Sequence, residues 1–404
     1  MLAFPFSNNM KTVLSLSEAR KLALHSQGLL STDPLQGKEG TLSIIQQIGY
    51  VQIDTISVVE RAHHHILWNR QPGYKPSYLN ELSEEKSIFE YWSHAAAYLP
   101  MEDFRYTLIN KKKHADRIAE RLPDTSIRSF VLERIKSEGA LQSKDFEHSK
   151  KSTGGWWEHK PAKHALELLF IQGDLMVARR VNFQKVFDLT ERVLPASVSK
   201  TMPTQEEYTR YLISSAIKAH GFASVEEISY LRGGDVRKSI QKTIKEMLEN
   251  GEILQVVIDT NKQTYYSTDE NLNSIKPSAN KKTHILSPFD NSVIQRKRLQ
   301  SLWDFDYQIE CYLPAPKRKF GYFCLPIMTG DDFIGRLDAK ADRKTKRLII
   351  NSLHIEKECT VDYSAIADSI AGFATFNGCN TIEITATFPS TIKKPLTKEL
   401  KILL

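Results

Sequence analysis

A glutamine and an aspartate two positions apart, Gln52 and Asp54, are the residues of this sequence best suited to hydrolytic chemistry. The run YVQIDT begins after Gly49, which is expected to end a helix, and we predict it to be a strand. Because strand side chains alternate, Gln52 and Asp54 would share one face, about 7 Å apart at the backbone, where both could contact one water. The carboxylate could deprotonate that water or stabilise a sugar cation, while the amide positions the water. The alternative is an ordinary amphipathic strand with one solvated face.

Aromatic and basic residues elsewhere suggest contacts with nucleic acid. The pair Trp156-Trp157 follows two glycines and could stack on bases or wedge into a duplex, or else pack in the core. Three basic clusters could bind phosphates if they line one groove, or could be solvated surfaces: Arg296-Lys297-Arg298, Lys317-Arg318-Lys319 and residues 340–347.

Histidine and cysteine patterns do not indicate a metal site. His63, His64 and His65 are consecutive, so on a helix they point in different directions and cannot all bind one ion. The cysteines, at positions 311, 324, 359 and 379, are widely spaced and contain no Cys-x-x-Cys pair, so we expect reduced thiols. Glycine-rich phosphate and dinucleotide loops and the Gly-x-Ser-x-Gly elbow are also missing from the sequence. We therefore expect neither metal nor cofactor.

Length and charge limit the classes of protein that the sequence can represent. The chain has 404 residues with 41% hydrophobic and 25% charged, an ordinary globular mixture for two to four domains. Lysine and arginine number 55 against 48 acidic residues, and the net charge of +7 is compatible with a nucleic-acid partner. No apolar run approaches the roughly 18 residues of a membrane span. We expect a monomer with no membrane partner, in the cytoplasm, where it would reach a bacterial nucleoid.

One order of elements occurs repeatedly along the chain. Residues 206–219, 224–231 and 235–249 are predicted helices, with a capping box at Ser224 and Glu227, and two strands follow Gly251. Three helices followed by a hairpin is the order of a winged helix. The same order is predicted before it, with Gly173 in the place of Gly251, and a looser copy begins at the capping box Ser15 and Glu18.

The C-terminal part has a different pattern. It contains strand-like runs (YQIECYL, GYFCLPIM, DFIGRLDAKA, RLIINSLHI), then a predicted helix at 362–377 and the run TIEITAT. We therefore predict an α+β protein with three tandem winged-helix units and a β-rich, barrel-like domain. The predicted boundaries are 1–120 with the catalytic strand, 121–200, 201–280 and 281–404.

The whole chain resembles the YcaQ branch of the AlkZ-type winged-helix DNA glycosylases. The similarity is carried by long ordered segments: YVQIDTI at 50–56, EYWSHAAAYLP at 90–100, GGWWEHKP at 154–161, NFQKVFDLTERVLP at 182–195, LSPFDNSVIQRKR at 286–298, PAPKRKFGYFCLP at 314–326 and GRLDAKADR at 335–343. The last 40 or so residues match only loosely. The resemblance implies a C-shaped molecule that holds DNA in its concave face, and a glutamine–apolar–aspartate catalytic motif, here Gln52, Ile53 and Asp54.

The resemblance also implies an activity, which is the cofactor-free hydrolysis of the N-glycosidic bond of N7-alkylguanine and the unhooking of interstrand crosslinks in double-stranded DNA. Within the matching segments, the residues of suitable type to contact DNA are His94, Trp156, Trp157, Lys163, Arg296, Arg298, Lys317, Arg318 and Lys319. His94 either lines the site or braces a core strand. One departure follows His94, where alanine stands in place of an acidic residue of the family pattern; this difference could shift the substrate range or the rate.

Two functions from other classes remain as alternatives. A non-catalytic winged-helix regulator would bind a specific DNA sequence and would not need Asp54. A structural or partner-docking protein would bind no DNA.

Overall fold

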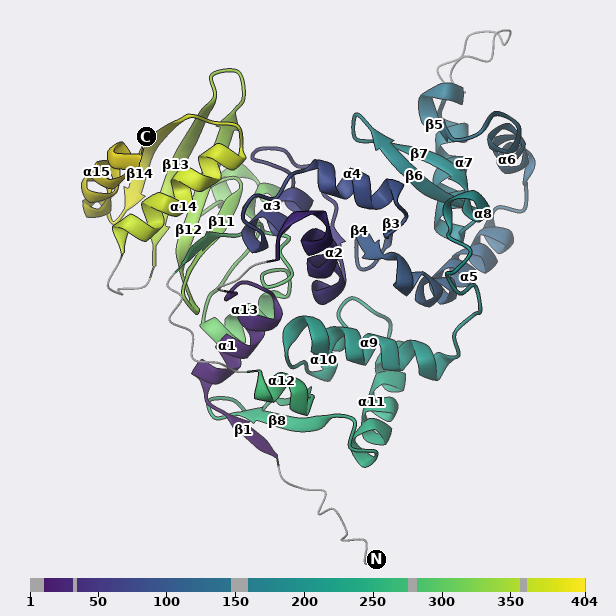
Figure 1. Ribbon diagram of the computed structural model, residues 1–404, viewed down its shortest axis with the longest axis horizontal. Coiled ribbons are helices and arrows are strands. Elements are labelled where there is room, and N and C mark those ends of the chain that lie inside the picture. Colours follow the sequence, from purple (N-terminus) through teal and green to yellow (C-terminus); the bar gives the residue numbers. More distant parts are fainter. Residues whose placement is uncertain (1–10, 32–34, 147–158, 275–281, 357–361, 404) are drawn as a thin grey trace, which may run out of the picture.

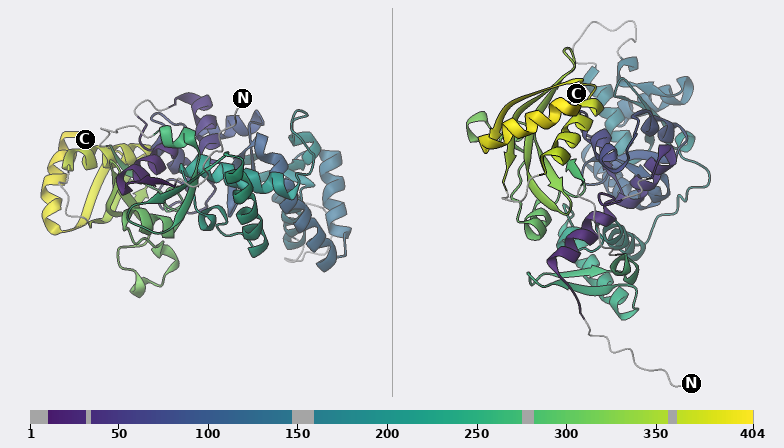
Figure 2. Two further views of the ribbon diagram at one scale, coloured as in Figure 1. Left: turned by 90° about the horizontal axis from the view of Figure 1, so that it is seen from below. Right: turned by 60° about the vertical axis from the view of Figure 1, so that its left-hand side comes forward.

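The computed structural model describes residues 11–31, 35–146, 159–274, 282–356 and 362–403. The protein is α+β. We use first, second and third unit and C-terminal domain for four parts that follow the predicted ranges, except that residues 101–120 are described with the second unit. Figure 1 shows the first unit in the middle, with the other three parts around it. In the left view of Figure 2 the C-terminal domain and the second unit lie at opposite ends of the molecule. The domain boundaries themselves stay a prediction.

The first unit combines four helices with a small sheet in the order β2-β4-β3. Its elements are α1 (Leu16–Ser26), α2 (Gly37–Ile48), β2 (Val51–Gln52), α3 (Ala62–Arg70), α4 (Ser77–Glu84), β3 (Ile88–Trp92) and β4 (Ala96–Pro100). The predicted capping box at Ser15 and Glu18 is confirmed. Gly49 ends α2 with a φ of 79°, which turns the chain directly into β2. The segment EYWSHAAAYL forms most of the hairpin β3–β4, because the chain reverses where the Ser93 N–H donates to the Ala95 carbonyl.

The second unit has the expected order of helices and strands. It contains η1 (Met101–Asp103), α5 (Phe104–Arg121), α6 (Ser126–Glu138), β5 (Leu141–Gln142), η2 (Ser143–Phe146), α7 (His159–Gln172), β6 (Leu175–Val181), β7 (Gln184–Leu189) and α8 (Thr190–Val193). Gly173 ends α7 with a φ of 99°, as the sequence predicts. The hairpin β6–β7 pairs with β5 in one sheet.

The third unit also has three helices followed by a hairpin. Its elements are α9 (Gln205–His220), α10 (Val225–Ile228), α11 (Gly234–Glu249), β8 (Leu254–Ile258), β9 (Thr264–Ser267) and α12 (Asp269–Asn273). The capping box of Ser224 and Glu227 begins α10, as predicted. The far N-terminal strand β1 (Thr12–Leu14) pairs in parallel with β8, so the start of the described chain completes the sheet of the third unit.

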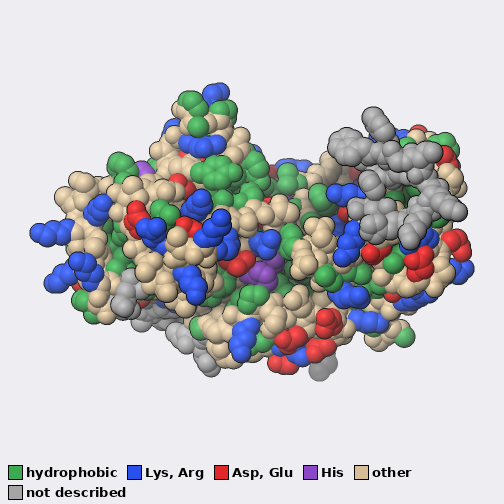
Figure 3. Space-filling view, turned by 90° about the horizontal axis from the view of Figure 1, so that it is seen from above, with side chains coloured by type: hydrophobic (Ala, Val, Ile, Leu, Met, Phe, Trp, Pro, Cys, Tyr) green, Lys and Arg blue, Asp and Glu red, His purple; other side chains and the backbone are tan. Residues whose placement is uncertain are grey.

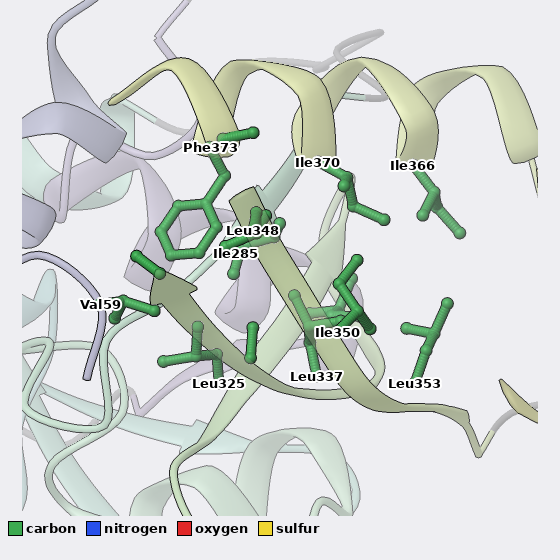
Figure 4. Close-up of a cluster of buried hydrophobic side chains, with 14 of the residues drawn as sticks. Val59, Ile285, Leu325, Leu337, Leu348, Ile350, Leu353, Ile366, Ile370 and Phe373 are labelled. Carbon is green, nitrogen blue, oxygen red and sulfur yellow. The ribbon is translucent and has the colours of Figure 1, made fainter. Parts of the chain in front are cut away.

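The C-terminal domain is built on a five-stranded sheet in the order β10-β11-β12-β13-β14. Its elements are β10 (Thr283–Ile285), α13 (Arg296–Trp303), η3 (Glu310–Tyr312), η4 (Ala315–Lys317), β11 (Cys324–Thr329), β12 (Asp332–Asp342), β13 (Arg347–Ile355), α14 (Tyr363–Phe376), β14 (Thr381–Phe388), η5 (Ser390–Ile392) and α15 (Lys393–Leu403). In Figure 4 the apolar face of α14, including Ile370 and Phe373, is directed at strand residues such as Leu348 and Ile350. This packing buries one face of the sheet.

One predicted strand is wrong. The run YQIECYL has the alternation of a strand, but it is irregular and ends in the short helix η3. The reason is Glu310, whose carboxylate accepts the backbone N–H groups of Lys319, Phe320 and Gly321 at 2.9–3.0 Å. A side chain therefore supplies the hydrogen bonds that a neighbouring strand would otherwise supply.

A buried ion pair joins the first unit to the C-terminal domain. The guanidinium of Arg70 donates to both carboxylate oxygens of Asp290 at 2.7 and 2.9 Å, and to the Gln27 backbone carbonyl at 2.7 Å. The side chains of the pair are 1% and 0% exposed. Within the described residues, no helix is long and apolar enough to cross a membrane.

Candidate active site

The segment that carries Gln52 and Asp54 begins as a strand and then leaves the sheet. Gln52 lies in β2 opposite Ala97, and the Ile53 N–H donates to the Ala96 carbonyl at 2.8 Å. The Asp54 carboxylate then accepts the Ile56 N–H at 2.7 Å, which turns the chain away from β4. The expected single strand therefore ends before Asp54. The Asp54 side chain stabilises the turn that follows it.

The residues after Asp54 are fixed to the C-terminal domain. The Val58 carbonyl accepts the Ala341 N–H at 2.9 Å, and the Arg343 guanidinium donates to the carbonyls of Ser57 and Val59 at 2.9 and 3.1 Å. The side chain of Val59 is buried in the core of that domain, where Figure 4 shows it near Leu325. Asp54 is thus held between the sheet of the first unit and the sheet of the C-terminal domain.

Gln52 is buried, with 6% of its surface exposed, and has a specific partner. Its Oε1 lies 3.1 Å from Nε2 of His94, in the β3–β4 turn. The His94 ring meets the ring of Tyr50 edge to face, with centroids 5.0 Å apart, and that of Tyr230 at 5.8 Å. Burial, together with the charge of Arg232, lowers the pKa of His94 to about 4. The imidazole is therefore neutral at neutral pH and can donate one N–H to the amide oxygen, which fixes the orientation of Gln52.

Asp54 is half-buried and faces the loop that carries η3. Burial raises the pKa of the Asp54 carboxyl, against the opposing effect of the backbone N–H groups of Ile56 and Thr55. Burial and then the negative charge of Asp54 raise the pKa values of Cys311 and Tyr312, so these two side chains are close enough to sense that charge. Tyr312 is 69% exposed.

Lys163, another predicted DNA-contact residue, lies near the residues on either side of Asp54. It is exposed on α7 and lines a cleft of about 590 Å³ whose wall also includes Ile53 and Thr55. The cleft therefore lies between the second unit and the segment that carries Gln52 and Asp54. Trp156 and Trp157 lie outside the described residues.

The two arginines of α13 have roles inside the fold. The buried Arg298 donates to the Glu227 carboxylate at 2.9 Å and to the His220 carbonyl at 3.0 Å. Arg296 donates to the Pro288 carbonyl at 2.7 Å, and its guanidinium lies 4.6 Å from the centre of the Tyr307 ring. Because these contacts occupy both guanidinium groups, the geometry does not favour either residue as a phosphate contact.

The cluster Lys317-Arg318-Lys319 is better placed for a partner. Lys317 and Lys319 are exposed, whereas Arg318 donates to the Leu313 carbonyl at 3.0 Å and packs over the Tyr322 ring. On the face in Figure 3, lysine and arginine side chains are spread around a central area where acidic and histidine side chains meet.

The three consecutive histidines are part of the core. His65 Nε2 lies 2.7 Å from the Ile285 carbonyl oxygen, His64 Nδ1 lies 2.8 Å from the Tyr74 hydroxyl, and the ring of His63 stacks on that of Phe183. Among the residues that the structure describes, no group of three or more His, Cys, Asp or Glu side chains is arranged to hold a metal ion.

Sequence reasoning missed several aromatic and basic neighbours of this site. The sequence contained a signal for Tyr50, because it precedes Gln52 by two positions and strand alternation would place both side chains on one face. Tyr230, Arg232 and Tyr312 had none, because loops of the third unit and the C-terminal domain bring them in. Tyr50, His94, Tyr230 and Arg232 line a cavity of about 100 Å³, which is room for a few waters.

Comparisons with known proteins agree with this architecture. A family model described as "DNA glycosylase AlkZ-like" matches residues 45–376, which is most of the chain. Among solved structures, the DNA glycosylase AlkZ of Streptomyces sahachiroi is similar, with a TM-score of 0.62 and 14% sequence identity, over 93% of this chain and 100% of that one. At this identity the structural likeness shows the fold alone. The family match decides the assignment, and the chain belongs to the AlkZ-like DNA glycosylases.

Proposed function

We propose that this protein is a monofunctional DNA glycosylase that hydrolyses the N-glycosidic bond of N7-alkylguanine. The same hydrolysis, at a guanine crosslinked through N7, would unhook an interstrand crosslink. The observation that carries the proposal is the pair of Gln52, oriented by His94, and the half-buried Asp54 carboxylate two residues later. Double-stranded DNA is the proposed partner, and the reaction needs no cofactor.

The chemistry requires little from the protein beyond charge and a positioned water. Alkylation at N7 makes the guanine cationic, so it can leave without a general acid. As the C1′–N9 bond breaks, its electron pair neutralises the base, and a positive charge develops on the sugar. The Asp54 carboxylate stabilises this charge or accepts a proton from the water that bonds to C1′. Its raised pKa makes it a better proton acceptor than an ordinary aspartate.

Gln52 is proposed to hold the attacking water. Its Oε1 has two lone pairs, so it can accept the His94 N–H and a water O–H at the same time. Lys163, Lys317 and Lys319 are proposed phosphate contacts because they are exposed. No lysine is assigned to a Schiff base, so strand cleavage after base loss is not expected.

The test is base release from three duplexes: one with a single N7-methylguanine, one with a nitrogen-mustard crosslink and one undamaged. We expect abasic product from the first two and none from the third. Release from neither damaged duplex, together with binding to one particular DNA sequence, would overturn the proposal and favour the regulator. Failure to bind DNA across a salt series would favour the docking protein.

A further inference from the structure

Leu231 is in an unfavourable position by two criteria. Its φ is 55°, in the left-handed region that side chains other than Gly, Asn and Asp rarely adopt, and its side chain is 71% exposed. Leu231 follows the end of α10, and the other described non-glycine residues with positive φ also lie near helix ends or in hairpin turns, but none of them is an exposed aliphatic residue: Lys86, Asn182, Phe183, Asp304 and Lys346. An exposed leucine gains little from burial, so no folding benefit of its side chain offsets the conformational cost.

The loop around Leu231 is held firmly against the candidate active site. Tyr230 precedes it, with its ring 5.8 Å from that of His94 and its hydroxyl 3.4 Å from the Ile294 carbonyl. Arg232 follows, with its backbone N–H bonded to the Ser229 carbonyl at 2.9 Å. Both neighbours line the cavity that also contains Tyr50 and His94. Leu231 therefore lies in the chain between two residues of the cavity wall, in the loop from the short helix α10 to the long helix α11, with its own side chain exposed.

An exposed aliphatic side chain fixed beside the proposed glycosylase site suits one task. Apolar side chains enter a duplex between neighbouring base pairs, where they unstack one step and kink the helix. We propose that Leu231 is such a wedge: it enters the duplex next to the alkylated guanine and opens the stack, so that C1′ becomes accessible to the water held by Gln52. This inference rests on the proposed glycosylase function. It makes Leu231 a substrate-positioning residue, because it would contact DNA and not the reacting atoms.

The strain itself provides a sharp test. Leu231→Gly removes the side chain and also relieves the left-handed backbone, so the variant should fold at least as stably as the wild type. We expect its single-turnover rate of N7-methylguanine release to fall about tenfold or more, and Leu231→Met, which keeps an apolar side chain of similar length, to retain most of the rate. Lys86→Gly is the matched control, because it relieves a φ of 57° after α4, far along the chain from the loop. It should leave the rate unchanged.

A second readout separates the wedge from the glycosylase proposal. In the Asp54→Asn background, 2-aminopurine next to the lesion should brighten when protein binds, and this rise should disappear with Leu231→Gly. If the wild type excises nothing but the rise still depends on Leu231, the wedge stands and the glycosylase proposal fails. Excision within about twofold of wild type in Leu231→Gly, or an unchanged fluorescence rise, would overturn the wedge.

Discussion

At the scale of single residues, the Asp54 carboxyl sets the expected pH dependence. Burial raises its pKa, so the group is protonated over a wider acidic range than an ordinary aspartate. Because only the ionised form can accept a proton or stabilise a cation, we expect single-turnover excision to fall as the pH drops through this raised value. A rate profile between about pH 4 and about pH 8 measures it.

The control for this profile is His94, whose own pKa of about 4 could produce an acidic limb. His94→Gln keeps a hydrogen-bond donor for Gln52 and removes the titrating ring. The fall in excision rate at acidic pH should persist in this variant. It should be absent from the residual activity of Asp54→Asn. If the fall in rate at acidic pH disappears in His94→Gln, the titrating group is the imidazole, and our interpretation is contradicted.

The residue pattern alone revealed only the site residues that are close in the chain, whereas His94 was suggested by the family resemblance. Gln52 and Asp54 could be recognised because an amide and a carboxylate that can act on one water stand two positions apart in the sequence. Tyr312 lies beside Asp54 in space but is separated from it by most of the chain, and its approach depends on the backbone hydrogen bonds to Glu310. A contact of that kind has no local signal.

At the scale of elements, the Arg70–Asp290 pair should dominate the stability of the junction between α3 and the C-terminal domain. Burial would raise the pKa of Asp290, but the Arg70 guanidinium and the Ser292 hydrogen bonds hold it below its usual value. We expect Arg70→Leu to lower the free energy of unfolding by about 3–5 kcal/mol, because a buried charge loses its partner. Urea unfolding near pH 7 measures the difference.

The pH dependence of that loss has a defined sign. In the wild type the folded pKa of Asp290 is depressed, so its contribution is present above about pH 4 and is lost as the pH falls through the folded value. In Arg70→Leu, burial alone would raise the pKa, so acid neutralises the unpaired carboxylate and the deficit shrinks. A deficit under about 1 kcal/mol, or one that grows in acid, would contradict this role of the pair.

Elements with local signals were predicted well. Both capping boxes, at Ser15 and at Ser224, begin helices, because each depends on residues three positions apart. The run YQIECYL failed because alternation alone cannot distinguish a strand from a loop whose hydrogen bonds end on a carboxylate. The parallel pairing of β1 with β8 joins residues more than 240 positions apart, and no periodicity encodes it.

At the scale of the whole molecule, binding to duplex DNA should depend on salt through the exposed lysines. We expect Lys317→Ala and Lys319→Ala each to weaken binding on any sequence and to reduce the slope of log K against log salt by about 1. The measurement is fluorescence anisotropy with undamaged duplex across a salt series.

The matched control for those lysines is Arg298, which is buried against Glu227. Arg298→Met should lower stability and leave the salt slope unchanged, because its charge does not reach the surface. A reduced slope in Arg298→Met with no change in either lysine variant would reverse this assignment.

The arrangement of the four parts could not be predicted from the residues. It depends on polar contacts between distant segments, such as the Asn291 amide, which donates to the carbonyls of Ile48 and Tyr50 at 3.1 Å. These bonds fix the chain immediately before Gln52 to the C-terminal domain. The resemblance to a family supplied the arrangement in outline, whereas each contact required coordinates.

The most direct test of the central claim compares wild type with Asp54→Asn on a duplex that carries one N7-methylguanine. The change is nearly isosteric and removes only the charge and the basicity of the carboxylate. We expect the single-turnover rate of base release to fall about 100-fold or more while the dissociation constant for the same duplex stays within about threefold. A variant that releases the base at the wild-type rate would contradict the role of Asp54.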